Sequence, residues 1–316
     1  MTDSTISVSH LTHHYGERTA LNDVSFEIPR GEIFGFLGPN GGGKTTMFKI
    51  LSTLIRPSEG TAEVCGFNVQ TSPAEVRKHI GVVFQSPSLD QKLTVKENLH
   101  FQGILYGLHG RELIHRIDDI LSHLKLSERA HDEVEKLSGG QQRRVEVGKG
   151  LLHYPDVLIL DEPSTGLDPG ARIDLWQYLL ELNRSRGITI VVTTHILDEA
   201  EHCHRLAILD QGNLVALGTP DELKHEIGGD VVSVIANDPE KVHRMMKEKF
   251  GNNISIFEKT IRMEREDAHR FVPQLIEAFP GQISSVSVSK PTLEDVFIHR
   301  TGHRLWNEER SNGVKK

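Results

Sequence analysis

One glycine-rich loop constrains the fold of this chain more than any other feature. Four residues separate Gly38 from Gly43, and Lys44 and Thr45 follow directly. A compact apolar run precedes the loop and a helical pattern over 44–55 follows it. In such a strand–loop–helix context backbone N–H groups cradle phosphates, because the glycines remove side chains and allow unusual backbone angles. The residues expected to bind a nucleoside triphosphate are Gly38, Pro39, Asn40, Gly41, Gly42, Gly43, Lys44, Thr45 and Thr46.

The sequence around this loop predicts an α/β fold. Residues 4–37 have the alternation of short strands. The runs 157–160 and 188–192 are continuously apolar, as in strands buried on both faces of a parallel sheet, and helical patterns such as 171–185 separate them. We therefore expect a P-loop NTPase core with a parallel sheet, antiparallel N-terminal strands and a helical subdomain at about 89–150.

A change of pattern near residue 228 predicts a second domain. The order there is strand, helix, strand, strand, helix, strand, at 231–236, 239–250, 254–257, 260–263, 267–279 and 283–288. This order is that of a small ferredoxin-like α+β domain. We therefore expect an ATPase domain at 4–227, a C-terminal domain at 228–300 and a loose polar tail at 301–316.

Composition narrows the possible functions. The formal net charge of −8 argues against nucleic acid as the main partner. Cys65 and Cys203 lack metal-type spacing and give no disulfide framework, which suits a reducing cytosol. No apolar run approaches the roughly 18 residues needed to span a bilayer, and residues 1–10 lack the apolar core of a signal peptide. If the protein works at a membrane, another chain supplies the spanning segments.

Two acidic residues close the apolar run 157–160. Asp161 is expected to bind Mg²⁺, directly or through water, together with the Thr45 hydroxyl. Glu162 points in a different direction and can polarise an attacking water. Solvated carboxylates at a strand end are common, so these assignments depend on the phosphate loop upstream.

A second glycine-rich segment, 137–144, predicts a second anion site on the same domain. Ser138 and Gln141 have the spacing of a capping box at the start of a helix. A cap does not explain Gly139 and Gly140, since adjacent glycines cost helix stability. At a helix N-terminus, however, glycines give an anion free access to backbone N–H groups. One nucleotide does not need both sites, so we expect the chain to close on another copy of its own type around shared nucleotide.

Together these motifs make residues 4–225 resemble the ATP-binding subunits of ABC transporters. Residues 137–141 match the signature motif of that family. The resemblance implies that Gln85 is the Q-loop glutamine, which contacts Mg²⁺ or the attacking water and couples to the membrane partner. It also implies that Asp168 belongs to the D-loop, and that His195 is the switch histidine that senses the γ-phosphate.

Other positions carry the resemblance further. Tyr15 resembles the aromatic residue that stacks on adenine, although a turn tyrosine remains the alternative. Gly42 departs from the family pattern, which has alanine or serine there. The segments 198–201 and 291–297 resemble the branch that includes daunorubicin-resistance-type drug exporters, whose membrane partners are of the ABC-2 type. That branch often carries a small C-terminal domain like the one predicted at 228–300.

The resemblance implies an ATPase motor for transport, with export of drugs or other hydrophobic or amphipathic compounds as its expected task. Two ATPase domains, expected to form a homodimer, meet head to tail, and segment 138–141 of one closes over the ATP of the other. Glu162 activates water, and His195 and Gln85 position it. A separate ABC-2 type transmembrane permease subunit holds the dimer peripherally at the cytoplasmic face of the membrane, with residues 86–100 as the candidate contact.

A soluble ABC-type ATPase that acts on nucleic acid or ribosomes is the alternative. DNA-repair members insert a long coiled coil between Q-loop and signature, whereas here the gap is 137 − 85 = 52 residues without sustained heptads. Ribosome-type members carry two cores in one chain, and this sequence has one. A phosphate-loop kinase or GTPase switch would not need the signature, and a regulator with little turnover would not need Glu162 and His195.

Overall fold

The computed structural model describes residues 4–251, 254–257 and 259–305, and the polar tail predicted at 301–316 therefore lies mostly outside the described residues. The chain divides into two compact units, the first ending at Leu217 and the second beginning at Gly218, whereas the sequence analysis placed the division at 227/228. Among the described residues, no helix combines the length and the apolar character that crossing a membrane requires.

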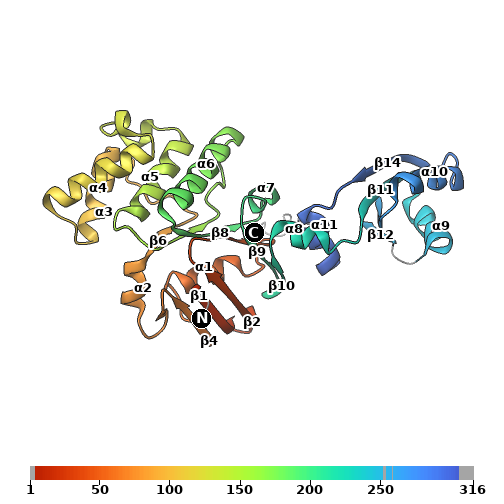
Figure 1. Cartoon of the computed structure of the whole chain (residues 1–316), viewed down its shortest axis with the longest axis horizontal. Coiled ribbons are helices and arrows are strands. Elements are labelled where there is room, and N and C mark those ends of the chain that lie inside the picture. The colour runs from red at the N-terminus through yellow and green to blue at the C-terminus, as the bar shows by residue number, and fades with distance from the viewer. Residues whose placement is uncertain (1–3, 252–253, 258, 306–316) are drawn as a thin grey trace, which may run out of the picture. The chain divides into compact units, whose positions relative to one another are not determined.

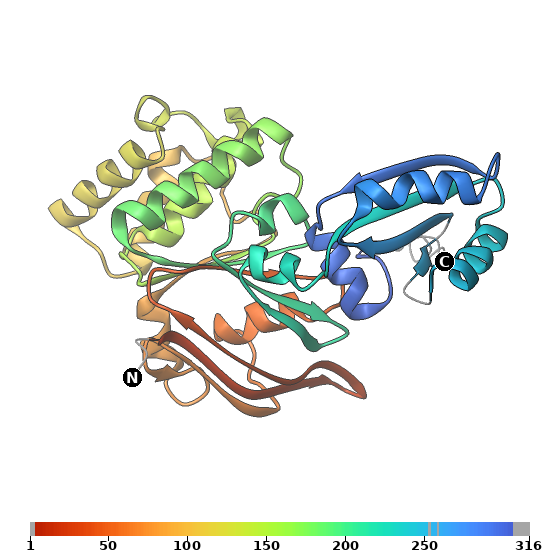
Figure 2. The same cartoon turned by 45° about the vertical axis from the view of Figure 1, so that its right-hand side comes forward.

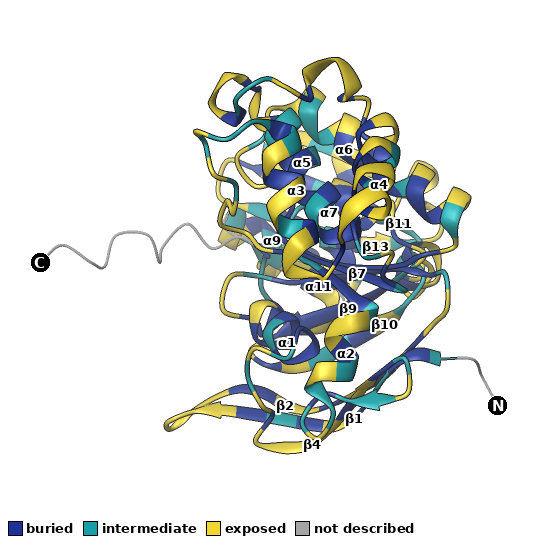
Figure 3. Ribbon diagram, turned by 90° about the vertical axis from the view of Figure 1, so that its left-hand side faces the viewer, coloured by how far each residue is buried: buried dark blue, intermediate teal, exposed yellow. Residues whose placement is uncertain are grey.

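A six-stranded sheet forms the centre of the first unit, in the order β10-β9-β3-β8-β7-β6. Strands β3, β6, β7, β8 and β9 are parallel, so their carboxyl ends meet at one edge. Every residue of β3, β7 and β8 is buried, as the continuously apolar runs predict (Figure 3). The strand bounds are β3 (Ile33–Leu37), β6 (Ile80–Val83), β7 (Val157–Asp161), β8 (Thr189–Thr194), β9 (Arg205–Asp210) and β10 (Asn213–Gly218).

An antiparallel sheet lies across helix α1 (Lys44–Leu51) from this parallel sheet (Figure 1). Helix α1 contacts strands of both sheets, and its buried face therefore belongs to a core that both share. Three phenylalanines, Phe26, Phe34 and Phe36, pack ring to ring in that core, with centroids 5.3–5.6 Å apart. The antiparallel sheet has the order β2-β1-β4-β5, with bounds β1 (Ser4–Tyr15), β2 (Arg18–Pro29), β4 (Glu59–Val64) and β5 (Phe67–Asn68).

A group of helices covers the other side of the parallel sheet. Helices α3, α4 and α5 contact one another, and α5 also contacts α6 and β6. Gly148 lets α5 approach its neighbours, because a Cβ there would lie 2.6 Å from Leu124 Cδ1. The group comprises α3 (Val95–Leu105), α4 (Gly110–His123), α5 (Gly139–Leu151), α6 (Pro169–Arg186) and α7 (Leu197–Ala200), with short 3-10 turns η1 (Ser127–Arg129) and η2 (Val134–Lys136). Helix α2 (Pro73–His79) lies on the side of α1 instead and contacts β5 and β6.

The second unit contains the expected ferredoxin-like arrangement (Figure 2). Its antiparallel sheet has the order β12-β13-β11-β14, so each βαβ half is split by a strand of the other half. Apolar side chains from the sheet and from α9 and α10 form its core, and α11 contacts α8. The elements are α8 (Pro220–His225), β11 (Asp230–Ala236), α9 (Pro239–Phe250), β12 (Ile254–Phe257), β13 (Thr260–Arg265), α10 (Ala268–Ala278), β14 (Ile283–Ser289) and α11 (Leu293–Thr301).

Candidate nucleotide-binding and catalytic site

The phosphate loop runs from the carboxyl end of β3 to the N-terminus of α1. Gly41 and Gly43 have φ angles of 82° and 112°, which side-chain-bearing residues rarely adopt. A Cβ on Gly38 would lie 2.1 Å from the carbonyl oxygen of Leu209, so that position also requires glycine. The loop borders a cavity of about 130 Å³, lined by Tyr15, Arg18, Ala20, Asn40, Gly41, Gly43, Lys44, Thr45, Thr46 and Glu162.

Lys44 is buried at the base of this loop. Its Nζ donates hydrogen bonds to the carbonyl oxygens of Gly38, at 2.8 Å, and Pro39, at 3.0 Å, and lies 3.7 Å from Glu162 Oε1. Burial lowers the pKa of Lys44, while the carboxylates of Glu162 and Asp161 oppose that shift. An ammonium group beside a glycine-rich loop at a helix N-terminus suits a phosphate ligand.

Two carboxylates leave the carboxyl end of β7 in different directions. Glu162 has a positive φ of 44°, and its N–H donates to the carbonyl oxygen of Thr193 at 3.1 Å. The Thr193 hydroxyl donates to Asp161 Oδ1 at 2.5 Å. Burial raises the pKa of Asp161, while the hydrogen bond from Thr193 opposes that shift.

Three side chains converge on the Glu162 carboxylate from separate loops. Gln85 Nε2 donates to Oε2 at 3.1 Å, and the Thr165 hydroxyl donates to the same oxygen at 3.3 Å. His195 Nδ1 lies 3.1 Å from Oε1. The hydrogen bond from His195 is the main cause that lowers the pKa of Glu162, so the group is ionised at neutral pH. Gln85, Glu162 and His195, singled out separately in the sequence, thus form one cluster beside Lys44.

The signature segment begins α5 with the predicted capping box. Ser138 Oγ accepts from the N–H of Gln141 at 3.3 Å, and Gln141 Oε1 accepts from the N–H of Ser138 at 3.0 Å. Gly140 has a packing reason that the sequence did not reveal, since a Cβ there would lie 2.7 Å from Ala171 Cβ. Gly139 has only ordinary contacts, so packing does not require glycine there.

The signature segment and the D-loop aspartate lie apart from the cavity. None of residues 138–141 is among the cavity-lining residues. Asp168 caps the N-terminus of α6, where its Oδ1 accepts from the N–H of Ala171 at 2.9 Å. Since Ala171 also packs on Gly140, the N-termini of α5 and α6 form one exposed surface.

Tyr15 ends β1 at a turn and also borders the cavity. Its position therefore agrees both with a turn tyrosine and with a tyrosine that stacks on adenine. Its ring is 46% exposed and packs edge to face on His13, with centroids 4.6 Å apart. The Arg18 guanidinium, at the start of β2, donates to the carbonyl oxygen of Gly41 at 3.3 Å. An exposed aromatic face at the rim of the cavity is suited to stacking on a nucleobase.

Arg143 is a buried connector that the sequence analysis missed. Its Nη1 donates to the carbonyl oxygen of Phe84 at 2.7 Å and to Glu146 Oε2 at 2.5 Å, and its Nε donates to the carbonyl oxygen of Pro163 at 2.6 Å. It therefore ties the signature helix to the residues that adjoin Gln85 and Glu162. The only sequence signal was an arginine one turn into a helix, which is normally a surface position.

Glu199 is a second buried connector, in α7, and it is 1% exposed. It accepts hydrogen bonds from the hydroxyls of Ser164 and Thr194, the latter at 2.6 Å. Arg172 Nε lies 3.7 Å from the same carboxylate. The segment 164–168, which the family resemblance identifies as the D-loop, and the strand end that carries His195 thus share one buried acceptor. An acidic residue in the segment 198–201 gave no sequence signal for this role.

Comparison with known families divides the chain much as the structure does. Residues 21–165 match the family described as ABC transporter, and residues 218–301 match the family described as ATP-binding protein DrrA1-3-like, C-terminal domain.

Curated relatives match over almost the whole chain. The Linearmycin resistance ATP-binding protein LnrL of Bacillus subtilis (strain 168) is 34% identical over 95% of this chain and 99% of its own length. The Nod factor export ATP-binding protein I of Ralstonia nicotianae is 38% identical over 95% of this chain and 94% of its own length. The Daunorubicin resistance ATP-binding protein DrrA3 of Streptomyces coeruleorubidus is 34% identical, covering 96% and 97%.

Solved ATP-binding cassettes share the fold of the first unit. CbiO1 of Clostridium perfringens, part of the ABC transporter complex cbiONQ, has 29% identity and a TM-score of 0.67, over 78% of this chain and 96% of that chain. The cassette MJ0796, dimeric in a post-hydrolysis state and bound to ADP and Pi, has 30% identity and a TM-score of 0.60, over 68% of this chain and 98% of that chain. The chain therefore belongs to the ABC transporter ATP-binding proteins, and it is an ABC ATPase with a DrrA-like C-terminal domain.

Proposed function

We propose that this chain hydrolyses Mg-ATP to power export through a separate ABC-2 type permease. The observation that carries the proposal is the Glu162 cluster, in which an ionised carboxylate lies between Lys44, Gln85 and His195 at the edge of the phosphate loop. A carboxylate so placed can accept a proton from water, and the amide and imidazole can orient that water.

The loop and its neighbours fit ATP and Mg²⁺. The glycine positions let a phosphate approach the backbone closely, and Lys44 can exchange its two carbonyl acceptors for phosphate oxygens. Thr45 is exposed toward the cavity, and Asp161 closes the adjacent strand, so these two residues and Gln85 would hold Mg²⁺. The ion would neutralise charge on the transferred phosphate. Tyr15 would stack on the adenine.

Hydrolysis by Glu162→Gln tests the catalytic part of the proposal. The amide keeps the shape of the side chain but cannot accept the proton, so we expect turnover to fall roughly 10²–10⁴-fold while ATP binding persists. Glu181→Gln, an exposed residue on α6, is the matched control and should hydrolyse ATP at the parental rate. Parental turnover by Glu162→Gln would contradict the assignment of Glu162 as the base.

We propose that two chains share nucleotide, with the signature segment of each closing over the ATP of the other. Ser138 and Gly139 are exposed, Gly139 carries no packing constraint, and neither residue borders the cavity of its own chain. A capped helix N-terminus with open N–H groups is suited to the γ-phosphate of a facing subunit. The dimeric ADP and Pi complex of the related cassette MJ0796 supports this arrangement.

The proposed permease contact lies at the loop after Gln85 and the adjoining helix α3. Phe101, Ile104 and Leu105 are 53%, 41% and 82% exposed, a set of large apolar side chains on one helix. A partner that covers them would hold the ATPase at the cytoplasmic face of the membrane. Leu105→Asp should therefore weaken co-purification with the permease and leave ATP binding intact.

The relatives named for linearmycin resistance, daunorubicin resistance and Nod factor export favour export of hydrophobic or amphipathic compounds by this chain as well. The alternative, a soluble ABC-type ATPase on nucleic acid or ribosomes, is disfavoured by the net charge of −8. Transport of such compounds by membrane vesicles that contain the chain and its permease, lost with Glu162→Gln, is the decisive assay.

A further inference from the structure

Three potential metal ligands meet at the edge of the parallel sheet opposite to the nucleotide site. His79 ends α2 directly before β6, and Asp156 directly precedes β7, which runs parallel to β6. Cys65 lies in the turn between β4 and β5. The five residues of β7 place this edge about 16 Å from the carboxylates at the other end of that strand. The cluster is therefore separate from the ATPase machinery.

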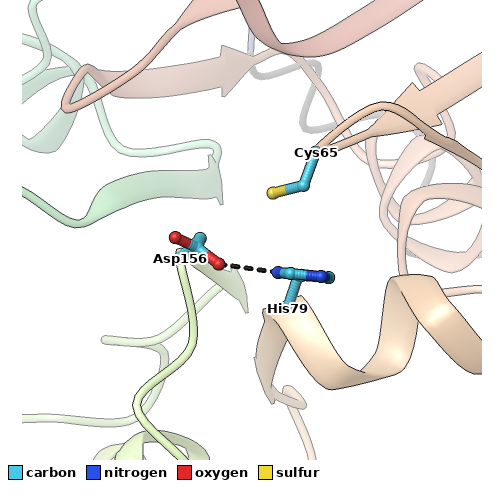
Figure 4. A group of neighbouring side chains, drawn as sticks. All are labelled: Cys65, His79 and Asp156. Atoms are coloured by element: carbon cyan, nitrogen blue, oxygen red, sulfur yellow. Dashed lines mark hydrogen bonds and ion pairs between the residues drawn. The ribbon is translucent and has the colours of Figure 1, made fainter.

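The three side chains face one another (Figure 4). One ligand atom from each of Cys65, His79 and Asp156 lies within 4.8 Å of the other two. His79 Nδ1 and Asp156 Oδ2 are 2.7 Å apart, and the Cys65 sulfur points toward that pair. All three residues are half-buried, and the His79 ring is fixed by stacking on Phe67, with centroids 5.3 Å apart.

We propose that Cys65, His79 and Asp156 form a binding site for a transition-metal ion, with Zn²⁺ as the best match. Thiolate, imidazole and carboxylate are the donors that zinc prefers, whereas Mg²⁺ and Ca²⁺ take oxygen ligands. Tetrahedral zinc holds such ligand atoms about 3.3–3.6 Å apart. The His79 and Asp156 ligand atoms, now 2.7 Å apart, must therefore separate by about 0.7 Å to admit the ion, and the Cys65 sulfur must lie within the same range of both. Three protein ligands leave the fourth position to water.

The backbone at Cys65 supports the proposal independently. Cys65 and Gly66 are the two loop residues between paired Val64 and Phe67, with φ angles of 51° and 79°. Such a turn favours Asn, Asp or Gly at its first position, and a cysteine adopts positive φ only with strain. Turn chemistry therefore does not explain this cysteine, whereas a ligand role does.

Arg30 completes the site as a neighbour of the carboxylate. Its Nη2 lies 3.3 Å from Asp156 Oδ1, which leaves Oδ2 for the metal and fixes the carboxylate plane. Cysteine binds a metal ion as the thiolate, so binding at Cys65 displaces the thiol proton.

Cobalt titration of the full chain, freed of metal with a chelator and without nucleotide, tests the site. We expect one Co²⁺ per chain with a thiolate-to-cobalt charge-transfer band, and displacement of that band by Zn²⁺. Cys65→Ser should abolish the band, and His79→Gln should weaken affinity at least about tenfold. Cys203→Ala, which removes the other, buried cysteine, should leave the band unchanged. A band that survives Cys65→Ser, or no band in the parent, would overturn the proposal.

A second measurement needs no variant. Alkylation of Cys65 in the parent protein, followed by peptide mass spectrometry, should slow at least about tenfold when Zn²⁺ is added, because the metal ties up the thiolate. Zn²⁺ should also raise the Tm, since a ligand that binds the folded state stabilises it. Equal alkylation rates with and without Zn²⁺ would count against the site.

Discussion

The two units of this chain differ in how much charge they bury. In the first unit, buried side chains near the carboxyl edge of the parallel sheet include Lys44, Arg143, Glu146, Asp161, Glu162 and Glu199. Among the described residues of the second unit, Asp295 is the charged side chain that is buried, and Arg262 Nη2 lies 2.7 Å from it. Buried charge destabilises a fold unless it is paired, so its concentration in one unit indicates where chemistry takes place.

The largest effect is expected from removing Arg143, which lies at the centre of the network of buried charged side chains in the first unit. Arg143→Met should lower the free energy of unfolding by about 3–5 kcal/mol, because the buried Glu146 keeps its hydrogen bond from the Ser88 N–H but loses its cationic partner. Urea denaturation measures this change, and ATP hydrolysis should fall as well, since the Phe84 carbonyl adjoins Gln85. The neighbouring variant Arg144→Met is the control, expected to cost less than about 1 kcal/mol. Equal effects of both variants would contradict a connecting role for Arg143.

The matching change in the second unit is Asp295→Asn. It removes the charge opposite Arg262 and weakens the capping box with Thr292, so local stability should fall by about 2–3 kcal/mol. Hydrogen exchange should speed up in β13 and α11, while ATP hydrolysis stays at the parental rate. Glu277→Gln, at an exposed position of α10, is the control and should change neither the hydrogen exchange nor the ATP hydrolysis. Lost hydrolysis in Asp295→Asn would show that the buried pair serves the ATPase.

A smaller effect is expected at Glu199. In Glu199→Gln one of the two oxygens becomes an amide, so the hydroxyl of Ser164 or Thr194 loses its acceptor at a cost of about 1–2 kcal/mol. If the carboxylate holds the D-loop and the His195 strand together, kcat should fall while KM for ATP stays unchanged. Glu201→Gln, exposed two residues later, is the control. A higher KM with unchanged kcat would instead indicate an effect on nucleotide binding.

The smallest expected effect is a pH dependence from Glu162. Its folded-state pKa lies below the ordinary value of 4.5, so its contribution to stability is present above pH 4.5 and is lost as the pH falls through the folded pKa. The difference in unfolding free energy between the parent and Glu162→Gln should therefore stay constant near neutrality and change only below pH 4.5. A difference that varies between pH 6 and 8 would contradict this assignment, which predicts roughly no change there.

Local patterns in the sequence were sufficient to predict the fold class. Continuous apolar runs identified the parallel strands, because strands buried on both faces need no polar side chains. The glycine loop and the acidic residues at the end of β7 indicated that the ligand binds at the carboxyl edge of the sheet, because all the parallel strands end at that edge. The capping box of Ser138 and Gln141 was predictable because it depends on spacing within one helix turn.

Contacts between distant segments could not be predicted in this way. Arg143 meets the Phe84 carbonyl across 59 positions, and His79 meets Asp156 across 77. Neither pair leaves a periodic signal, and cysteine spacing alone argued against a metal site. The unit boundary at Leu217 also differs from the predicted 227/228, because α8 resembles the end of the first domain in sequence but contacts α11.

In the proposed dimer, two chains share nucleotide across their signature segments. Sedimentation of Glu162→Gln with and without Mg-ATP tests it most directly, because slow hydrolysis should preserve the closed state. We expect an ATP-dependent dimer with Glu162→Gln, and monomers that still bind ATP when Ser138→Arg is added, because the larger side chain blocks the facing phosphate. An ATP-dependent dimer that persists in the Glu162→Gln, Ser138→Arg double variant would contradict the shared site.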